Sequence, residues 1–330
     1  MQSLYLKHKI NLSSEEKIIS FKNNYMIKNK EKNWKGYKGK VLASANGFDV
    51  IENEERGFAH IIPIPDEEEL ENVYKHDYYE KEKPLYLERY LEDIDWWNDT
   101  YSHRYKIFER HLSKNSRSIL DIGSGPGYFL LKGKDLGWKV KGIEPSFSAF
   151  DHSNGLGLDV EQGFYNEKTA PDLGKYDVIN LGLVLEHIPY PEKMLGLLKK
   201  QLNNDGILCI IVPNDFNPFQ IMLRDNLNFK DWWVAPPHHI NYFNFQSLTK
   251  LLEKSGFSVI HQESTFPIDM FLLMGENYLN DDEVGRKCHK KRMNFEKAMR
   301  LNEDESLLER LYSDFAKQGI GREIVLYAKK

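Results

Sequence analysis

One short stretch limits the possible folds of this chain more than any other feature. Residues 118–130 read SILDIGSGPGYFL, an apolar run, then alternating glycines, then apolar residues again. An apolar run that ends in glycines indicates a buried strand, and the residues after it begin a helical pattern. Glycines permit a tight turn and let a ligand approach the backbone without meeting a Cβ atom. The stretch therefore predicts a strand–turn–helix unit of an open α/β sheet, with a ligand site at the turn.

Strands and helices alternate after this unit, which is the order expected of a mostly parallel sheet. We expect strands near residues 140–143, 176–181, 207–212, 257–262 and 323–328, and helices near 128–136, 146–154, 191–202 and 245–255. The third strand, which should end before Gly163 or Phe164, is poorly marked. The predicted fold is a doubly wound, Rossmann-like α/β sheet of seven strands, mostly parallel, with an antiparallel last strand.

The chain before and after this core suggests attached pieces. Residues 1–40 hold ten Lys and three Glu, a net charge of +7, and form an expected basic extension. Residues 41–100 form an expected appendage, with short strand runs at 41–43, 48–51 and 58–62 and the start of a long helix, broken once. In that helix, apolar residues recur every three or four positions from Leu87 to Leu112. Residues 101–330 form the expected main domain, with a helical insertion near 265–320 whose pattern is clearest over 294–317.

Charge and cysteine content narrow the class of protein. A net charge of −5 gives no signature of nucleic-acid or membrane binding, so we expect a small-molecule substrate. The two cysteines, Cys209 and Cys288, exclude a disulfide framework and a four-cysteine metal site. Because no apolar run reaches the roughly 20 residues that span a bilayer, we expect a cytoplasmic protein. A homo-oligomer is left open.

The spacing of the turn glycines points to a cofactor. Gly123, Gly125 and Gly127 give G-x-G-x-G and follow Asp121, whereas dinucleotide binders use G-x-G-x-x-G. Glu144 follows about twenty residues later at the end of the next strand, where a carboxylate can accept ribose hydroxyls. The glycines alone could form an ordinary strand–helix turn, and Glu144 alone could be a surface acid. Together they favour S-adenosylmethionine over NAD, with S-adenosylhomocysteine as the product.

Three segments resemble the successive motifs of class I S-adenosylmethionine-dependent methyltransferases: Leu120–Gly127, Glu144 and Tyr176–Pro191. Residues 207–214 and 236–257 resemble the branch common in sugar and polysaccharide biosynthesis. The resemblance implies a glycine loop that holds the methionine part of the cofactor and an acid that holds the ribose. The cofactor-binding residues that follow are Asp121, Gly123, Ser124, Gly125, Gly127, Tyr128, Glu144, Pro145, Phe164 and Leu183.

Residues 53–58 differ from the zinc-binding motif that is common at this position in the similar family. A segment like Asn53–Phe58 often contains a C-x-x-C-G-F zinc element in that branch, but here Asn53 and Arg56 occupy the cysteine positions. Neither side chain replaces a thiolate, so we expect no structural zinc at this segment. No compact ligand motif appears elsewhere in the sequence, and we expect no metal.

Several residues are candidates for the chemistry. His239 could remove a proton from a hydroxyl acceptor near neutral pH, although one of the two adjacent histidines could instead cap the following helix. Glu186 and His187 are further base candidates, or a polar hinge before the next helix. For Asn214 and Asp215 the alternative is turn formation. The tryptophan pairs Trp96–Trp97 and Trp232–Trp233 could contact the acceptor, or one ring of each pair could pack in the core. The candidate substrate-binding residues are Asn214, Asp215, His238, Tyr242 and Trp232.

Taken together, these features predict methyl transfer from S-adenosylmethionine to a small polar acceptor. The resemblance favours a hydroxyl group of a nucleotide-activated sugar or a glycan. Two alternatives remain: an NAD-linked oxidoreductase, which the glycine spacing disfavours, and a catalytically silent scaffold that binds the cofactor.

Overall fold

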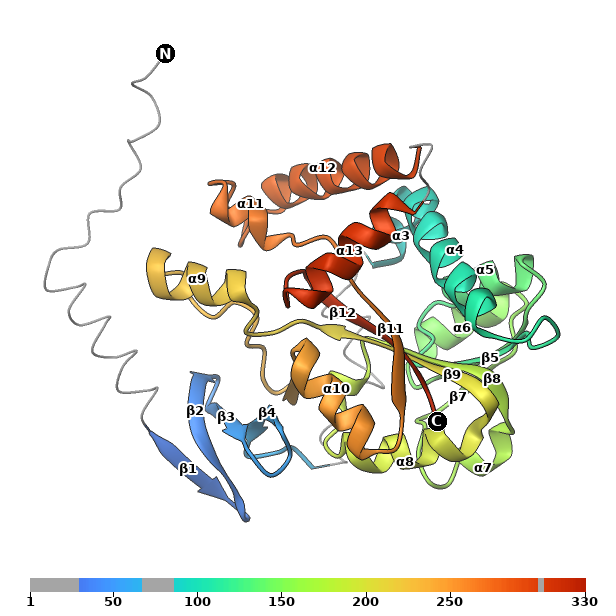
Figure 1. Ribbon diagram of the computed structural model, residues 1–330, viewed down its shortest axis with the longest axis horizontal. Coiled ribbons are helices and arrows are strands. Elements are labelled where there is room, and N and C mark those ends of the chain that lie inside the picture. The colour runs from blue at the N-terminus through green and yellow to red at the C-terminus, as the bar shows by residue number, and fades with distance from the viewer. Residues whose placement is uncertain (1–29, 67–85, 302–305) are drawn as a thin grey trace, which may run out of the picture.

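The computed structural model describes residues 30–66, 86–301 and 306–330. Figure 1 shows a central twisted sheet with helices on both faces and a second, smaller sheet to one side. Most of the predicted basic extension, residues 1–29, lies outside the described residues.

The central sheet has seven strands in the order β11-β12-β9-β8-β5-β6-β7. Strands β5 to β9 pair in parallel, and β12 is antiparallel to both β9 and β11, so the predicted fold class is confirmed. The chain leaves β5 toward β6 and β7 and returns on its other side at β8, which makes this the point where ligands bind in such folds. The strands are β5 Ser118–Ile122, β6 Lys139–Glu144, β7 Val160–Gln162, β8 Tyr176–Gly182, β9 Leu202–Pro213, β11 Ser258–Ser264 and β12 Glu323–Lys329.

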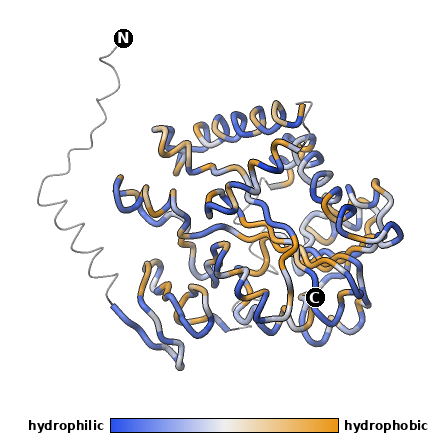
Figure 2. The backbone as a smooth tube through the Cα atoms, in the orientation of Figure 1, coloured by the Kyte–Doolittle hydropathy of each residue, from blue (hydrophilic) through white to orange (hydrophobic). Residues whose placement is uncertain are grey.

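Helices cover both faces because the strands are apolar on both sides, as the orange central strands of Figure 2 show. Neighbouring strand residues alternate between the faces: Val178 packs with α4 and α5, and Ile179 with α8 and α10. The helices outside the C-terminal insertion are α3 Tyr86–Glu92, α4 Ile94–His111, α5 Tyr128–Asp135, α6 Phe147–Gly155, α7 Ala170–Leu173, the 3₁₀ turn η2 Leu185–His187, α8 Pro191–Gln201, α9 Pro218–Leu227 and α10 Phe245–Lys254. No helix of the described ranges is both long and apolar enough to cross a membrane.

The predicted long helix has its single break at Asp93, between α3 and α4. The Asp93 carboxylate lies 2.8 Å from Arg286 Nη1 and 3.2 Å from His289 Nε2, both in α12 of the insertion. The break therefore provides a carboxylate that attaches the insertion to the N-terminal side of the main domain.

The smaller sheet has the order β1-β2-β3-β4-β10 and is antiparallel. Its first four strands are β1 Glu31–Trp34, β2 Tyr37–Ala45, β3 Phe48–Asn53 and β4 Phe58–Ile62, which include the three predicted runs. The fifth, β10, is the dipeptide Asn241–Tyr242 from the middle of the main domain, and Asn241 pairs with His60. Two residues carry no readable periodicity, so the sequence could not predict this strand.

The insertion between β11 and β12 contains α11 Asp269–Leu273, α12 Asp282–Arg300 and α13 Leu307–Lys317. The helical pattern read at 294–317 thus covers the end of one helix and all of the next. Glu296 joins them to the main domain: it accepts hydrogen bonds from Trp96 Nε1 and Tyr312 Oη, each at 2.6 Å. Figure 1 shows these helices along one side of the sheet.

Candidate active site

The loop between β5 and α5 is the centre of the candidate cofactor site. Gly123, Gly125 and Gly127 all have positive φ angles, 69°, 55° and 87°, which L side chains rarely adopt. A Cβ atom on Gly123 would lie 2.6 Å from Val184 Cγ2. The Gly123 amide donates to Ile143 O at 2.9 Å, which holds the loop against the end of β6. The glycines are required by backbone geometry, and they leave the loop open to a ligand.

Glu144 ends β6 and faces this loop. Its carboxylate accepts hydrogen bonds from the Gly125 amide at 2.8 Å and the Ser146 amide at 2.9 Å. Burial raises the pKa of Glu144 to about 7, although these two hydrogen bonds act in the opposite direction. Because a carboxylate has about four acceptor positions, two remain for a ligand.

Asp121 lies at the end of β5, beside Asn180 of β8. Asn180 Nδ2 donates to Asp121 Oδ1 at 2.7 Å, and burial raises the pKa of Asp121 to about 7. Within the described ranges, neither Asn180 Oδ1 nor Ser124 Oγ has a hydrogen-bond partner, although both atoms are buried. Such groups are normally satisfied. The acceptors and the open glycine backbone fit the ribose and amino-acid portions of S-adenosylmethionine.

The other predicted cofactor residues surround this edge. The Gly163 amide donates to Glu144 O at 3.0 Å, so the segment that carries Phe164 lies beside Glu144. Pro145 follows Glu144 in the chain. Tyr128 is instead stacked on Tyr90, with ring centroids 4.2 Å apart. Leu183 follows β8 with its side chain 44% exposed. Phe147, the residue after Ser146, is 61% exposed although it is aromatic, and it is a further candidate that the sequence analysis does not name.

Three candidate bases come together at the same edge of the sheet. Glu186, His187 and His239 place one ligand atom each within 4.8 Å of one another, and the two imidazole rings have centroids 5.2 Å apart. His187 Nδ1 lies 2.7 Å from His238 O. A carbonyl oxygen only accepts, so Nδ1 carries the proton and Nε2 is the basic nitrogen of neutral His187. That nitrogen lies 3.7 Å from Glu186 Oε1, which suits a base whose charged form is stabilised.

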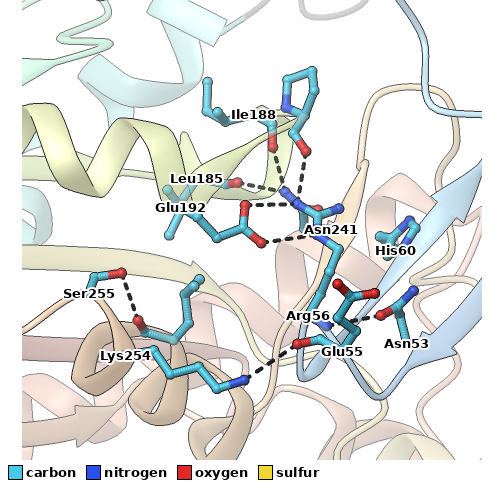
Figure 3. Close-up of polar contacts among 12 residues, drawn as sticks. Asn53, Glu55, Arg56, His60, Leu185, Ile188, Glu192, Asn241, Lys254 and Ser255 are labelled. Carbon is cyan, nitrogen blue, oxygen red and sulfur yellow. Dashed lines mark hydrogen bonds and ion pairs between the residues drawn. The ribbon is translucent and has the colours of Figure 1, made fainter. Parts of the chain in front are cut away.

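The 3₁₀ turn η2, which carries Glu186 and His187, is positioned by the strand β10. Asn241 Nδ2 donates to Leu185 O at 3.2 Å and to Ile188 O at 2.7 Å, as Figure 3 shows. The Ile240 amide donates to Glu186 O at 2.9 Å, while Ile61 of β4 donates to Ile240 O. The smaller sheet therefore helps to place the candidate bases.

Arg56, one of the two residues at the expected cysteine positions, also reaches this segment. Its guanidinium donates to Pro189 O at 2.9 Å and makes a two-point contact with Glu192 of α8, at 3.0 and 3.1 Å (Figure 3). Asn53 Oδ1 accepts from the Arg56 amide at 2.9 Å, which closes the turn between β3 and β4. Arg56 thus joins the smaller sheet to the segment before α8 and to α8 itself, and Asn53 stabilises the turn that carries Arg56.

The predicted substrate-binding residues follow β9 in the chain, and each makes different contacts. Asn214 Nδ2 donates to the carbonyls of Gly319 and Gly321, so this amide group is directed at the backbone before β12. Tyr242 Oη accepts from the Ala235 amide, and its ring contacts Phe216 and His239. Trp232 is half-buried beside the fully packed Trp233.

Asp215 is the unusual member of this group. Its side chain is buried, and no described residue forms a hydrogen bond with either carboxylate oxygen. Burial raises the pKa of Asp215 to about 7, the charge of Arg322 lowers it and Asp269 raises it. An unsatisfied buried carboxylate is costly, so a ligand that donates hydrogen bonds would offset that cost.

Comparison with known proteins agrees with this geometry. The ubiquinone biosynthesis O-methyltransferase of Paraburkholderia phytofirmans is 31% identical over 109 residues, which are 31% of this chain and 47% of that protein. The tRNA U34 carboxymethyltransferase of a Shewanella species is 27% identical over 199 residues, 57% of this chain and 59% of that protein. The chain thus spans about half the length of the curated relatives it matches.

Among solved structures, a SAM dependent methyltransferase from Archaeoglobus fulgidus aligns with a TM-score of 0.45 and 16% identity over 73% of this chain and 99% of that one. A family profile described as a methyltransferase domain matches residues 97–262, just over half of the chain. These residues contain the glycine loop, Glu144 and the cluster of candidate bases. The chain therefore belongs to the methyltransferase domain family, in its class I, S-adenosylmethionine-dependent form.

Proposed function

We propose that this protein methylates an oxygen atom of a small polar acceptor, with His187 as the general base. The observation that supports this proposal best is the hydrogen bond from His187 Nδ1 to a backbone carbonyl, because it directs the basic Nε2 away from that contact and beside Glu186. From the sequence alone His239 is the first candidate base. Because Nδ1 of His187 is held by a carbonyl, we assign the base to His187, and His239 lies beside it in a supporting position.

Each residue of the candidate site has a separate role in the proposed methyl transfer. Bound S-adenosylmethionine supplies an electrophilic methyl group, and the glycine loop and Glu144 would hold it. His187 Nε2 takes the proton of the acceptor hydroxyl, and Glu186 stabilises the resulting imidazolium. Val184 touches the glycine loop and immediately precedes η2, so the base and the cofactor loop are neighbours in space. Alignment of donor and acceptor supplies much of the remaining rate.

The acceptor is expected to donate hydrogen bonds. Asp215 lies two residues after the end of β9, and its two carboxylate oxygens would accept hydrogen bonds from hydroxyl groups of the acceptor. Phe216, Tyr242 and Trp233 form an aromatic cluster next to it, which suits a ring. The name of one relative, a ubiquinone biosynthesis O-methyltransferase, supports an oxygen acceptor. A hydroxyl of a nucleotide-activated sugar, which the sequence resemblance favours, is the second acceptor class.

The test is methyl transfer from labelled S-adenosylmethionine to a panel of catechols, phenols and nucleotide sugars. With an accepted substrate, His187→Gln is expected to lower kcat by roughly 10²–10⁴-fold while cofactor affinity is unchanged. His239→Gln should reduce kcat less. Gly125→Val, where φ is +55°, should abolish cofactor binding itself.

Each proposed role has a result that would contradict it. Equal kcat values for wild type and His187→Gln would remove the base assignment. Cofactor binding without transfer to any compound of the panel would favour the silent scaffold, and tighter binding of NAD than of S-adenosylhomocysteine would favour the oxidoreductase.

A further inference from the structure

A second cluster of ionisable side chains lies away from the candidate active site, where α4, β11 and α13 meet. His103 comes from α4, His261 and Glu263 from β11, and Glu309 from α13. His261 and Glu263 are two residues apart on one strand, so both side chains point to the same face of the sheet. All four side chains are at least three-quarters buried.

The distances within this cluster are those of metal ligands. His103 Nε2 lies 2.8 Å from Glu263 Oε1, and His261 Nε2 lies 3.4 Å from the same oxygen and 4.0 Å from Glu309 Oε1. Zinc binds histidine nitrogen and carboxylate oxygen at about 2.0–2.2 Å in a tetrahedron, which places ligand atoms about 3.3–3.5 Å apart. The observed separations bracket that value.

A cavity beside the cluster has room for an ion, and His261 Nε2 is available as a ligand atom. A cavity of about 50 Å³ adjoins His103, Glu263 and Glu309, and an ion the size of a water molecule needs about 10–15 Å³. His261 Nε2 is buried and has no hydrogen-bond partner within the described ranges. Glu263 Oε1 lies 3.4 Å away, so this nitrogen has an ion-pair neighbour but no well-formed hydrogen bond, and a bound cation would use its lone pair.

Positive side chains near the cluster suggest a competing interpretation, an ion-pair network without a metal. Arg110 makes a two-point contact with Glu309, the half-buried Arg104 lines the same cavity, and the His111 ring lies 6.1 Å from that of His261. Arg110 donates to both carboxylate oxygens of Glu309, so a metal would bind Oε1 through a lone pair that Arg110 does not use, and Arg110 would orient this ligand. Without a metal, the same residues would form a network of ion pairs and hydrogen bonds.

We propose that His103, His261, Glu263 and Glu309 form a structural site for a divalent transition metal of the zinc class. The two histidine nitrogens and two carboxylates are ligand types that zinc accepts, and together they neutralise its charge. Because the ligands come from three elements, the metal would fasten α13 of the insertion and α4 to the outer strand β11. Closed sites with four protein ligands contribute to folding rather than to chemistry.

The direct test is elemental analysis of the full chain after removal of metals, addition of Zn²⁺ and dialysis. His261→Gln is expected to hold about one zinc per chain less than wild type. Two controls should retain the wild-type zinc content of this site: His111→Gln, a neighbouring histidine that is not a ligand, and His239→Gln, which alters only the cluster at the active site. Equal zinc content in wild type and His261→Gln would overturn the proposal.

A second measurement does not depend on any variant folding well. Co²⁺ bound in place of zinc to wild type should give the visible absorption of a tetrahedral site. Zn²⁺, but not Mg²⁺, should raise the unfolding temperature of metal-free protein, because the ligands tie three elements together. If Co²⁺ gives no visible absorption and Zn²⁺ leaves the unfolding temperature unchanged, the cluster is an ion-pair network.

Discussion

Two residues at the carboxyl edge of the central sheet, Leu183 and Phe216, have left-handed backbone conformations without being glycine. Their φ angles are 59° and 54°. For an L residue this conformation costs about 1–2 kcal/mol, and such strain is found mainly at functional sites. Leu183 follows β8 and Phe216 follows β9, so each is next to a part of the candidate site. No sequence signal predicts this, because Leu and Phe are ordinary apolar residues of strands.

Replacement of Leu183 by glycine tests separately the backbone strain at this residue and its contribution to cofactor binding. Relief of the left-handed strain should offset the lost packing, so the unfolding free energy is expected to stay within about 0.5 kcal/mol of wild type. Met222→Gly is the matched control, since Met222 is also 44% exposed but lies inside helix α9, where glycine costs about 1 kcal/mol. Urea denaturation measures both. S-adenosylhomocysteine affinity should fall about tenfold only for Leu183→Gly.

Asp215 links the pH dependence of stability to acceptor binding. Its pKa in the folded state, about 7, is above the ordinary value of 3.8, so its contribution to stability is complete below about pH 3.8 and is lost as the pH rises through 7. Asp215→Asn removes this loss. Relative to wild type, the free energy of unfolding of the variant should therefore rise by about 2–4 kcal/mol between pH 4.5 and pH 8. KM for the acceptor should also rise.

Urea denaturation at the two pH values provides the measurement. Asp151→Asn, a change to an exposed carboxylate, is the control and should follow wild type at both. If Asp215→Asn and wild type differ by the same amount at pH 4.5 and pH 8, the buried carboxylate does not titrate in this range.

At the scale of elements, the turn η2 depends on a residue from the smaller sheet. Arg56 joins Glu192 and Pro189 O, on the C-terminal side of the candidate base His187. Lysine keeps the charge but cannot make the two-point contact. Arg56→Lys is expected to cost about 1–2 kcal/mol of stability and to lower kcat about tenfold, with cofactor affinity unchanged.

Lys254→Met is the matched control for Arg56→Lys. Lys254 also links α10 to the β3–β4 turn, through a long 3.5 Å contact with Glu55 O that is exposed to solvent (Figure 3). It should change neither kcat nor stability appreciably. An Arg56→Lys protein with wild-type kcat would mean that the smaller sheet does not position the turn η2.

The elements that could be predicted from the sequence are those with a local signature. The strand and glycine loop at 118–127 have one, and so does Glu144 at the end of the next strand. The approach of His187 to His239 could not be predicted, because 51 residues separate them and β4–β10 pairing brings the His239 segment to η2. For the same reason, the proposed metal site of His103, His261, Glu263 and Glu309 has no compact spacing in the sequence.

At the scale of the whole molecule, a bound cofactor should stabilise every part that unfolds together with its site. S-adenosylhomocysteine at 100 times its Kd is expected to add about 2.7 kcal/mol to the free energy of unfolding. Thermal unfolding with and without ligand measures this, and NAD at the same concentration should leave the unfolding temperature unchanged. A shift with NAD alone would contradict the assignment of the glycine loop to S-adenosylmethionine.

The dipeptide β10 has a consequence for any attempt to exchange parts between relatives. Because Asn241 and Tyr242 belong to the smaller sheet while their neighbours belong to the main domain, the N-terminal strands are not an interchangeable module. A chimaera that replaces residues 30–66 alone would place a foreign strand against Asn241 and so disturb the turn with the candidate bases. Exchange of acceptor specificity therefore requires residues 30–66 and the segment around 235–243 to be transplanted as a pair.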